Sequence, residues 1–323
     1  MKGDQLQDGE LRRRLLMLAA GLALGSCGGG AAAPVPAPAT PSAPAPVPPT
    51  PLPGPPPPPG PAPSRSAKRG VAYDFASLAD LQALSTGASW WYNWATRPNS
   101  ALPPGAASQA GMDYLPMLWN ASYDAPSVEA YVKANGSIRY LLVLNEPNLV
   151  DQADMAPAQA AAAWPGYEAV AAATGAKIVG PAVTWGTMPG YSDPVVWLDA
   201  FIAAYQAANG GRSPRIDYLA FHWYDYGLDA QLDRLAKYGK PFWVTEMANW
   251  HGGDSAVIDS PAKQQAQMTD MVRICEMRAD VFRYAWFTGR WASDAHFTSL
   301  LGSAAGELTD LGRLYLSLPF TPV

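Results

Sequence analysis

Histidine and cysteine are scarce in this 323-residue chain. The three histidines, His222, His251 and His296, never show the i, i+4 spacing of a helical zinc site, so the sequence does not support a metal centre. We predict no metal and no other cofactor. Only two cysteines occur, Cys27 and Cys275, which excludes a fold held together by a set of disulfides. Cys275 lies in a helical pattern and is expected to be a buried, unreactive residue.

Charge is scarce as well. Charged residues make up 15% of the chain, the formal net charge is −5, and no lysine- or arginine-rich run occurs after residue 66. A surface that follows the phosphates of a nucleic acid is therefore not expected. Tryptophan, in contrast, is abundant, and all twelve tryptophans lie between Trp90 and Trp291. Flat rings at this density suit the C–H faces of sugars, although core packing is expected for roughly half of them.

Residues 1–27 have the pattern of a bacterial lipoprotein signal peptide. Arginines at 12–14 precede an apolar run from Leu15 to Leu24, which is shorter than the about 20 residues of a bilayer span. The following Gly-Ser-Cys resembles a lipobox, which implies a lipid on Cys27; an ordinary signal peptide is the alternative. Gly28 after the cysteine implies the outer membrane, with a periplasmic or secreted protein as the alternative.

Residues 28–66 differ sharply in composition from the rest of the chain. Seventeen of the 33 prolines lie between Pro34 and Pro63, among alanines and glycines. Such a segment cannot bury a core and favours extended polyproline II, so we predict a disordered linker here. The remainder, residues 67–323, contains no second linker and has the length of one α/β barrel, about 250 residues.

Short β-branched and aromatic runs alternate with helical patterns through residues 67–323. Asp193-Pro194 and Ser260-Pro261 mark two of the helix starts. Eight strand–helix units predict an α/β fold, a (β/α)₈ TIM barrel. An open doubly wound sheet is the competing architecture, but no glycine-rich phosphate loop follows the first strand. The eight expected strands are Arg69 to Asp74, Ser89 to Trp94, Met112 to Trp119, Tyr140 to Asn145, Lys177 to Val183, Ile216 to Trp223, Pro241 to Thr245 and Phe282 to Phe287.

Two of the six glutamates after residue 66, Glu146 and Glu246, come directly after predicted strands, the fourth and the seventh. In a barrel, the C-terminal ends of the strands converge on the one face where active sites are built. Paired carboxylates across a cleft cleave glycosidic bonds, one as acid and the other as nucleophile or base. We therefore predict that Glu146 and Glu246 are catalytic; the alternative is two solvated loop carboxylates.

The motifs around these glutamates resemble glycoside hydrolase family 128, in clan A of the glycoside hydrolases. The resemblance extends from about Lys68 to Leu318, and seven motifs occur in order. They are Gly70-Val71-Ala72-Tyr73-Asp74, Trp91-Tyr92-Asn93-Trp94, Pro116-Met117-Leu118-Trp119, Asn145-Glu146-Pro147-Asn148, His222-Trp223-Tyr224, Trp243-Val244-Thr245-Glu246 and Arg283-Tyr284-Ala285-Trp286-Phe287.

This resemblance implies a β-1,3-glucanase that retains configuration by double displacement, with Glu146 as acid/base and Glu246 as nucleophile. We predict an endo-type enzyme, although the sequence leaves exo action open. Retention requires the two carboxyl groups about 5–5.5 Å apart. The resemblance also implies that Asn145 binds the sugar 2-hydroxyl, and that Tyr224 or His222 keeps the nucleophile ionised through hydrogen bonds.

Other side chains near strand ends are candidates for binding sugar. Trp286, which ends the eighth strand, is the predicted platform beneath the reacting sugar, and Trp250 and Trp291 lie in loops on the same face. For all of these the alternative is core packing, loop support or burial by a folded loop. Further candidates at neighbouring subsites are Asn93, Trp94 and Trp119.

Two other functions remain open at this point. Subsite loops decide specificity, so a clan A hydrolase acting on another β-glycan is one alternative. The other is a β-1,3-glucan-binding lipoprotein without hydrolytic activity, although both glutamates are present. The expected partner is a polysaccharide or oligosaccharide, and by resemblance a β-1,3-glucan. We expect no nucleic acid, membrane contact only through the lipid anchor, and a monomer.

Overall fold

The computed structural model describes residues 65–320. The predicted signal peptide, its lipidated Cys27 and nearly all of the predicted linker lie outside these residues. None of the helices within 65–320 is both long and apolar enough to cross a membrane.

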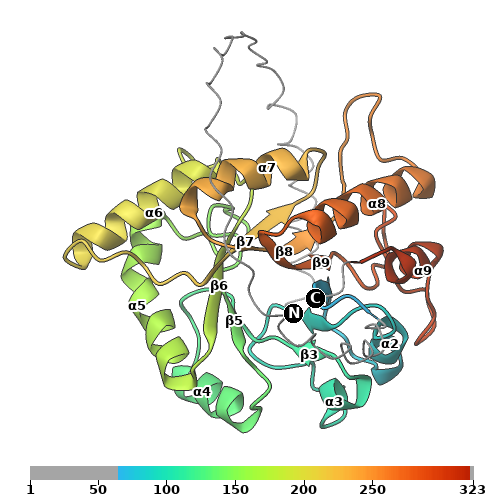
Figure 1. Cartoon of the computed structure of the whole chain (residues 1–323), viewed down its shortest axis with the longest axis horizontal. Helices are drawn as coiled ribbons and strands as arrows, with labels where there is room; N and C mark the ends of the chain where they lie inside the picture. The colour runs from blue at the N-terminus through green and yellow to red at the C-terminus, as the bar shows by residue number, and fades with distance from the viewer. Residues whose placement is uncertain (1–64, 321–323) are drawn as a thin grey trace, which may run out of the picture.

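Nine parallel strands form one curled sheet with helices around its outside, which is the arrangement of an α/β barrel (Figure 1). Their order is β3-β2-β1-β9-β8-β7-β6-β5-β4. The bounds are β1 Arg69–Ala72, β2 Trp90–Tyr92, β3 Asp113–Tyr114, β4 Met117–Leu118, β5 Tyr140–Val143, β6 Lys177–Val183, β7 Tyr218–Trp223, β8 Phe242–Met247 and β9 Val281–Trp286.

The two ends of this strand order, β3 and β4, are consecutive in the chain and separated only by Leu115 and Pro116. Together they occupy the expected third strand, Met112 to Trp119. The Leu115 amide still bonds to the Trp91 carbonyl of β2, at 3.0 Å, whereas the Pro116 carbonyl accepts from β5. Proline has no amide hydrogen to donate, so the strand is interrupted where its partner changes.

The helices follow the strands as the sequence pattern predicts. Asp193 and Ser260 cap two of the long helices by accepting hydrogen bonds from backbone amides of the first turn, each with proline at the first helical position. The bounds are α2 Leu78–Leu84, α3 Ala106–Ala110, α4 Ala125–Ala134, α5 Pro157–Thr174, α6 Pro194–Ala208, α7 Leu228–Leu235, the short 3₁₀ helix η2 Ala236–Tyr238, α8 Pro261–Met277 and α9 Asp310–Ser317.

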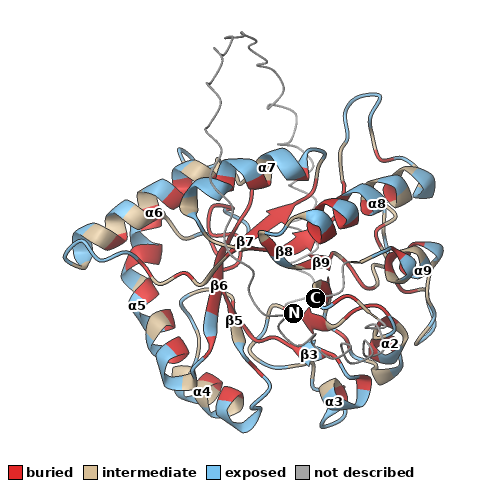
Figure 2. Ribbon diagram, in the orientation of Figure 1, coloured by how far each residue is buried: buried red, intermediate tan, exposed pale blue. Residues whose placement is uncertain are grey.

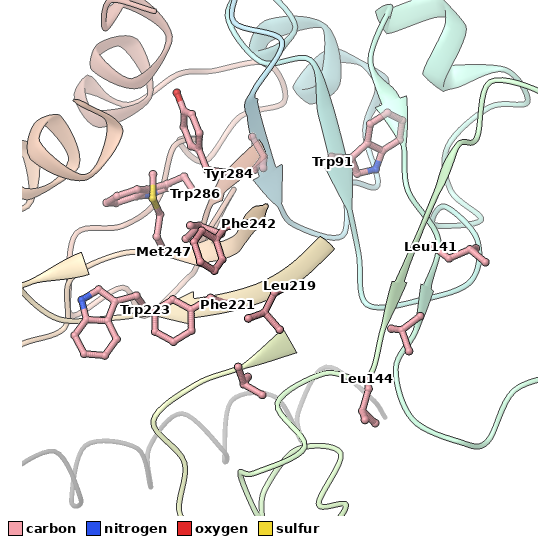
Figure 3. Close-up of a cluster of buried hydrophobic side chains, with 14 of the residues drawn as sticks. Trp91, Leu141, Leu144, Leu219, Phe221, Trp223, Phe242, Met247, Tyr284 and Trp286 are labelled. Atoms are coloured by element: carbon pink, nitrogen blue, oxygen red, sulfur yellow. The ribbon is translucent and has the colours of Figure 1, made fainter. Parts of the chain in front are cut away.

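Most strand residues are buried, as the red colour of most of the sheet in Figure 2 shows. Alternate residues enter two separate clusters, since side chains along a strand point to opposite faces. Trp90 and Tyr92 belong to a small inner cluster, whereas Trp91 belongs to the large cluster between sheet and helices. Part of the large cluster is drawn in Figure 3. Cys275 is fully buried in it, as expected.

Strand β8 contains one residue more than its two neighbours at its C-terminal end. Phe221 of β7 pairs with Val244, but His222 pairs with Glu246, so Thr245 is the extra residue. The pairing with β9 skips a position over the same stretch. A bulge of this kind interrupts the alternation of side chains and re-aims them. Because of it, Thr245 and Glu246 both contact groups of the candidate site.

Candidate active site

Glu146 lies three residues beyond the end of β5, in a strained turn. Leu144 and Glu146 have φ of +64° and +43°, a region that residues other than glycine rarely adopt. Neighbouring strand ends hold this turn: the Leu144 amide bonds to the Leu118 carbonyl at 2.8 Å, and the Glu146 amide bonds to the Ala182 carbonyl at 2.8 Å. Strain of this kind persists only when the surroundings impose it, and it concentrates at functional sites.

Glu146, His222 and Glu246 converge at the C-terminal ends of three strands. One ligand atom from each lies within 4.8 Å of the others, and all three residues are buried. The His222 Nδ1 atom is 2.9 Å from Glu146 Oε1 and 3.5 Å from Glu246 Oε2. Within residues 65–320, this is the group of histidine and carboxylate side chains that could hold a metal ion. Its atoms are also placed for acid–base chemistry without one.

Glu246 receives hydrogen bonds from three aromatic side chains. The Tyr92 hydroxyl donates to Glu246 Oε1 at 2.7 Å, the Trp94 indole donates to the same oxygen at 2.8 Å, and the Tyr224 hydroxyl donates to Oε2. Burial, and next the negative charge of Glu246, raise the pKa of Tyr92 well above its ordinary value, so this phenol keeps its proton and remains a donor. Three donors are the environment that a carboxylate anion requires in a buried site.

Asn145 lies beside the two glutamates with its amide oriented by a neighbouring loop. Its Nδ2 group donates to Gln152 Oε1 at 3.1 Å, whereas its buried Oδ1 atom accepts no hydrogen bond from the described residues. A buried acceptor of this kind is costly unless a ligand or water supplies a donor. Asn145 therefore presents a free oxygen that suits a sugar hydroxyl.

Aromatic rings form one side of the site; Tyr224 is buried, and the others are half-buried. Trp250 stacks on Tyr224, with ring centroids 4.0 Å apart, and Phe287 lies edge-on to Tyr224, Trp250 and Trp94. Trp291 contacts both Trp250 and Phe287. We call Trp94, Tyr224, Trp250, Phe287 and Trp291 the aromatic wall. Trp250 and Trp291 are thus brought to the site, although neither ring is freely exposed.

The loops that carry this wall are held by Gln264 of α8, which is fully buried. Its Nε2 group donates to the carbonyls of Asn249 and His296, at 2.8 and 2.7 Å, which lie in the loops after β8 and β9. One side chain thus fixes two active-site loops against the same helix.

A surface pocket of about 480 Å³ lies on the same face, between the loops after β4 and β5. The pocket is connected to the turn that carries Glu146 through the Ala153 amide, which bonds to the Asn145 carbonyl at 3.2 Å. Half-buried Trp119, next to the end of β4, directly precedes Asn120, one of the residues that line the pocket. The pocket is lined by Asn120, Ala121, Ser122, Ala153, Asp154, Met155 and Gln159.

The structure corrects two of the predicted sugar-binding residues. Trp286 is fully buried in the cluster between sheet and helices, and its indole donates to the Thr298 carbonyl at 2.8 Å (Figure 3). Its burial prevents it from serving as a platform. Because side chains alternate along a strand, the next residue, Phe287, points to the inner side instead. Asn93 supports a loop instead: its amide bonds to Asp74, to Tyr114 and to two backbone groups.

Sequence reasoning missed Tyr92 and Thr245, which bond to Glu246 and His222, and Phe287, which packs in the aromatic wall. A period of two along Trp90, Tyr92 and Trp94 could have placed Tyr92 inside the barrel. The same count from Trp243 places Thr245 inside, but it then sends Glu246 outward. Only the bulge in β8, which local sequence does not announce, resolves that conflict.

Comparison with known proteins agrees with this geometry. The family model described as the glycosyl hydrolase catalytic core matches residues 70–315. The alkali-sensitive linkage protein 1 of Schizosaccharomyces pombe is 27% identical over 272 residues, 79% of this chain. The match spans only 45% of that protein. The fold and the paired glutamates thus define the chain as a glycoside hydrolase.

Solved structures identify the family more closely. A subgroup II endo-β-1,3-glucanase of glycoside hydrolase family 128 from Pseudomonas viridiflava is 61% identical, with a TM-score of 0.78, over 80% of this chain and 100% of that one. The Sorangium cellulosum subgroup II enzyme is 36% identical over 79% and 99%, with a TM-score of 0.66. A subgroup I enzyme from Amycolatopsis mediterranei, in complex with laminaritriose, is 27% identical over 78% and 99%, with a TM-score of 0.60. The chain belongs to glycoside hydrolase family 128.

Proposed function

We propose that this protein is a retaining endo-β-1,3-glucanase with Glu146 as acid/base and Glu246 as nucleophile. The observation that carries the mechanism is the approach of the two carboxylates, which bring one oxygen each within 4.8 Å. Retaining enzymes have carboxyl groups about 5–5.5 Å apart, whereas inverting enzymes leave room for a water molecule at about 6.5–9.5 Å.

The two carboxylates have partners of opposite character, which supports their roles. Glu246 receives three hydrogen bonds from O–H and N–H donors, so its anion is stabilised and ready to attack the anomeric carbon. Glu146 faces a ring nitrogen of His222, a partner that can accept a proton shared by the carboxylic acid.

In the first step, Glu246 attacks the anomeric carbon while Glu146 gives its proton to the departing glycosidic oxygen. In the second step, Glu146 takes a proton from water, and the resulting hydroxide displaces Glu246 from the glycosyl-enzyme. The Asn145 oxygen accepts from the sugar 2-hydroxyl, a contact that strengthens in the transition state. Configuration is retained because the anomeric carbon is inverted twice.

The substrate assignment rests on the relatives. The Pseudomonas and Sorangium proteins are endo-β-1,3-glucanases, and Amycolatopsis structures hold laminari-oligosaccharides of up to six sugars. The aromatic wall bonds to Glu246 through Trp94 and Tyr224, and the pocket adjoins the turn that carries Glu146, so each glutamate has a neighbouring surface that a bound chain could contact. The interrupted third strand would close the sheet as an eight-stranded (β/α)₈ barrel.

We further propose that Cys27 anchors the protein by a lipid in the outer membrane.

The test is incubation of the purified protein with laminarin and defined laminari-oligosaccharides. We expect reducing ends to form, with proton NMR showing the β-anomer as first product, and internal cleavage of long oligosaccharides. Curdlan should be degraded, whereas xylan, mannan and cellulose should not. Glucan binding without new reducing ends would instead support a binding protein, and a first α-anomeric product would refute retention.

Variants of the two glutamates should separate their roles. We expect Glu246→Ala to abolish hydrolysis and, with azide, to form the α-glycosyl azide. Glu146→Ala should lower the rate about 10²–10⁴-fold on natural substrates and form the β-glycosyl azide. Glu129→Ala is the matched control, because this surface glutamate pairs only with Lys133 in the described contacts. Azide products of the reverse configuration would contradict the assignment.

A further inference from the structure

We propose that Thr245 is a positioning residue that holds His222 in the tautomer with a bare Nδ1 atom, so that Glu146 faces a proton acceptor. The inference rests on the proposed retaining activity and assigns a role in it to the extra residue of the β8 bulge.

Each ring nitrogen of His222 has its own side-chain partner. Nδ1 is 2.9 Å from Glu146 Oε1, and Nε2 is 2.9 Å from Thr245 Oγ1. His222, Thr245 and Glu146 each have 0% exposure, so solvent does not compete for these bonds. A neutral imidazole has one N–H donor and one acceptor nitrogen, and the partner of one nitrogen decides the state of the other.

A threonine hydroxyl can donate or accept; when Thr245 accepts from an Nε2–H group, the Nδ1 lone pair is directed at Glu146. In that state Glu146 must carry a proton to complete the hydrogen bond, as an acid catalyst does before cleavage. After the proton has passed to the leaving group, Glu146 Oε1 faces the Nδ1 lone pair of His222 instead of an N–H group. It is then a stronger base toward the incoming water, which the second step requires.

The opposite tautomer would serve the reaction less well. An Nδ1–H group would donate to Glu146 and stabilise its ionised form, removing the acid from the resting enzyme. Glu246 does not need that hydrogen, because Tyr92, Trp94 and Tyr224 already donate to it, and Nδ1 is 3.5 Å from its Oε2 atom. Among the described contacts, the titratable groups that face His222 are the two glutamates, and Tyr92 and Tyr224 lie behind Glu246.

The geometry of the bulge explains how Thr245 reaches the ring. In a regular strand, consecutive residues point to opposite faces, and Thr245 and Glu246 could not both face the site. The extra residue in β8 lets the threonine hydroxyl meet Nε2 while Glu246 meets the donors across the barrel.

The pH profile of kcat/KM tests this role. In Thr245→Val, which keeps the β-branched shape, the Nε2–H group loses its acceptor, at a cost of about 1–3 kcal/mol for a buried donor. The tautomer should shift toward Nδ1–H, and the basic limb of the profile should move down by about one pH unit, since 1.36 kcal/mol corresponds to one unit. Thr245→Ser should restore the limb.

Thr184→Val is the matched control. Thr184 is also a buried threonine beside His222, but its hydroxyl donates to the His222 carbonyl, at 3.3 Å, and does not touch the ring. The basic limb of the kcat/KM profile of the Thr184→Val variant should stay in place. A limb that is unmoved in a folded Thr245→Val protein, or equally displaced in Thr184→Val, would overturn the proposal.

A direct measurement is ¹⁵N NMR of the imidazole nitrogens in the wild-type protein, with His222→Gln to assign the signals. We expect a protonated Nε2 and a bare Nδ1 at pH values below the basic limb. Protonated Nδ1, or an imidazolium, would refute the tautomer. If the wild type had no activity on any glucan, the proposed function would fail, whereas the NMR result would still decide the state of His222.

Discussion

At the scale of single residues, the two glutamates of the proposed catalytic pair are distinguished by hydrogen-bond partners and not by burial, because both carboxylates are almost completely enclosed. Glu246 is surrounded by donors, and Glu146 faces an imidazole nitrogen. Similar burial with unlike partners is how two carboxyl groups of one site can adopt different protonation states.

Tyr92 offers a test at this scale. Tyr92→Phe removes one donor to Glu246 but keeps the ring, which packs on Trp90 and Trp94. A hydrogen bond to a charged group is worth about 1.5–3 kcal/mol, so kcat/KM should fall roughly 10- to 150-fold. Steady-state kinetics on laminarin check this, with thermal denaturation to show that the fold is kept. Loss of less than about threefold would mean that Tyr92 does not support the nucleophile.

At the scale of elements, the loops after β7 and β8 are joined beside the aromatic wall. His251 lies between two carboxylates, with Nδ1 2.8 Å from Asp225 and Nε2 3.0 Å from Asp254. Tyr226 contacts the same ring and donates to the Ala256 carbonyl at 2.7 Å. The loop 251–258 is thereby attached to the loop that begins with Tyr224.

This attachment should depend on pH. Burial alone would lower the pKa of His251, but the hydrogen bond to Asp254 and the charge of Asp225 outweigh it and raise the pKa above its ordinary value of about 6.5. A raised folded-state pKa means that the stabilisation is complete below about pH 6.5 and is lost as pH rises through the raised value.

Hydrogen exchange of residues 251–258, corrected for intrinsic rates, should therefore accelerate between pH 6 and pH 9. In His251→Asn the corrected rates should be fast at both pH values. Equal pH dependence in wild type and variant would show that the ion pairs with Asp225 and Asp254 do not hold this loop.

At the scale of the whole molecule, buried Arg69 joins the start of the barrel to its end. From β1 it donates to the Tyr315 and Leu318 carbonyls, at 2.5 and 2.9 Å, and to the Tyr284 hydroxyl. It also lies 3.6 Å from buried Glu276. The first strand, the last strand and the C-terminal helix are thus connected through one guanidinium.

Replacing this arginine should destabilise the whole fold. We expect Arg69→Met to lower the free energy of unfolding by about 3–5 kcal/mol, because it removes the cation beside a buried carboxylate. Arg313→Met is the matched control: its ion pair with Asp310 is exposed, and its loss should cost at most about 1 kcal/mol. Denaturant unfolding of both variants checks the prediction, and similar losses in the two would contradict it.

The strands were predictable to within a few residues because burial on both faces leaves continuous apolar runs such as Tyr140–Val143. Glu146 and Glu246 could be singled out because polar residues near the ends of such runs lie at the barrel's C-terminal face. The direction of the Trp286 side chain was not predictable, because an aromatic residue at the end of a strand can point inward or outward. The register with neighbouring strands decides between the two directions.

The sequence by itself determined the α/β architecture and singled out Glu146 and Glu246 as the proposed catalytic pair, since both depend on local patterns. Tertiary structure decided which aromatic rings face the sugar and which are core. It also decided that Thr245 and Glu246 share one face, and that Tyr92 and Trp94, about 150 residues before Glu246 in sequence, bond to Glu246. Such contacts depend on bulges and on pairing between distant segments, which no local pattern encodes.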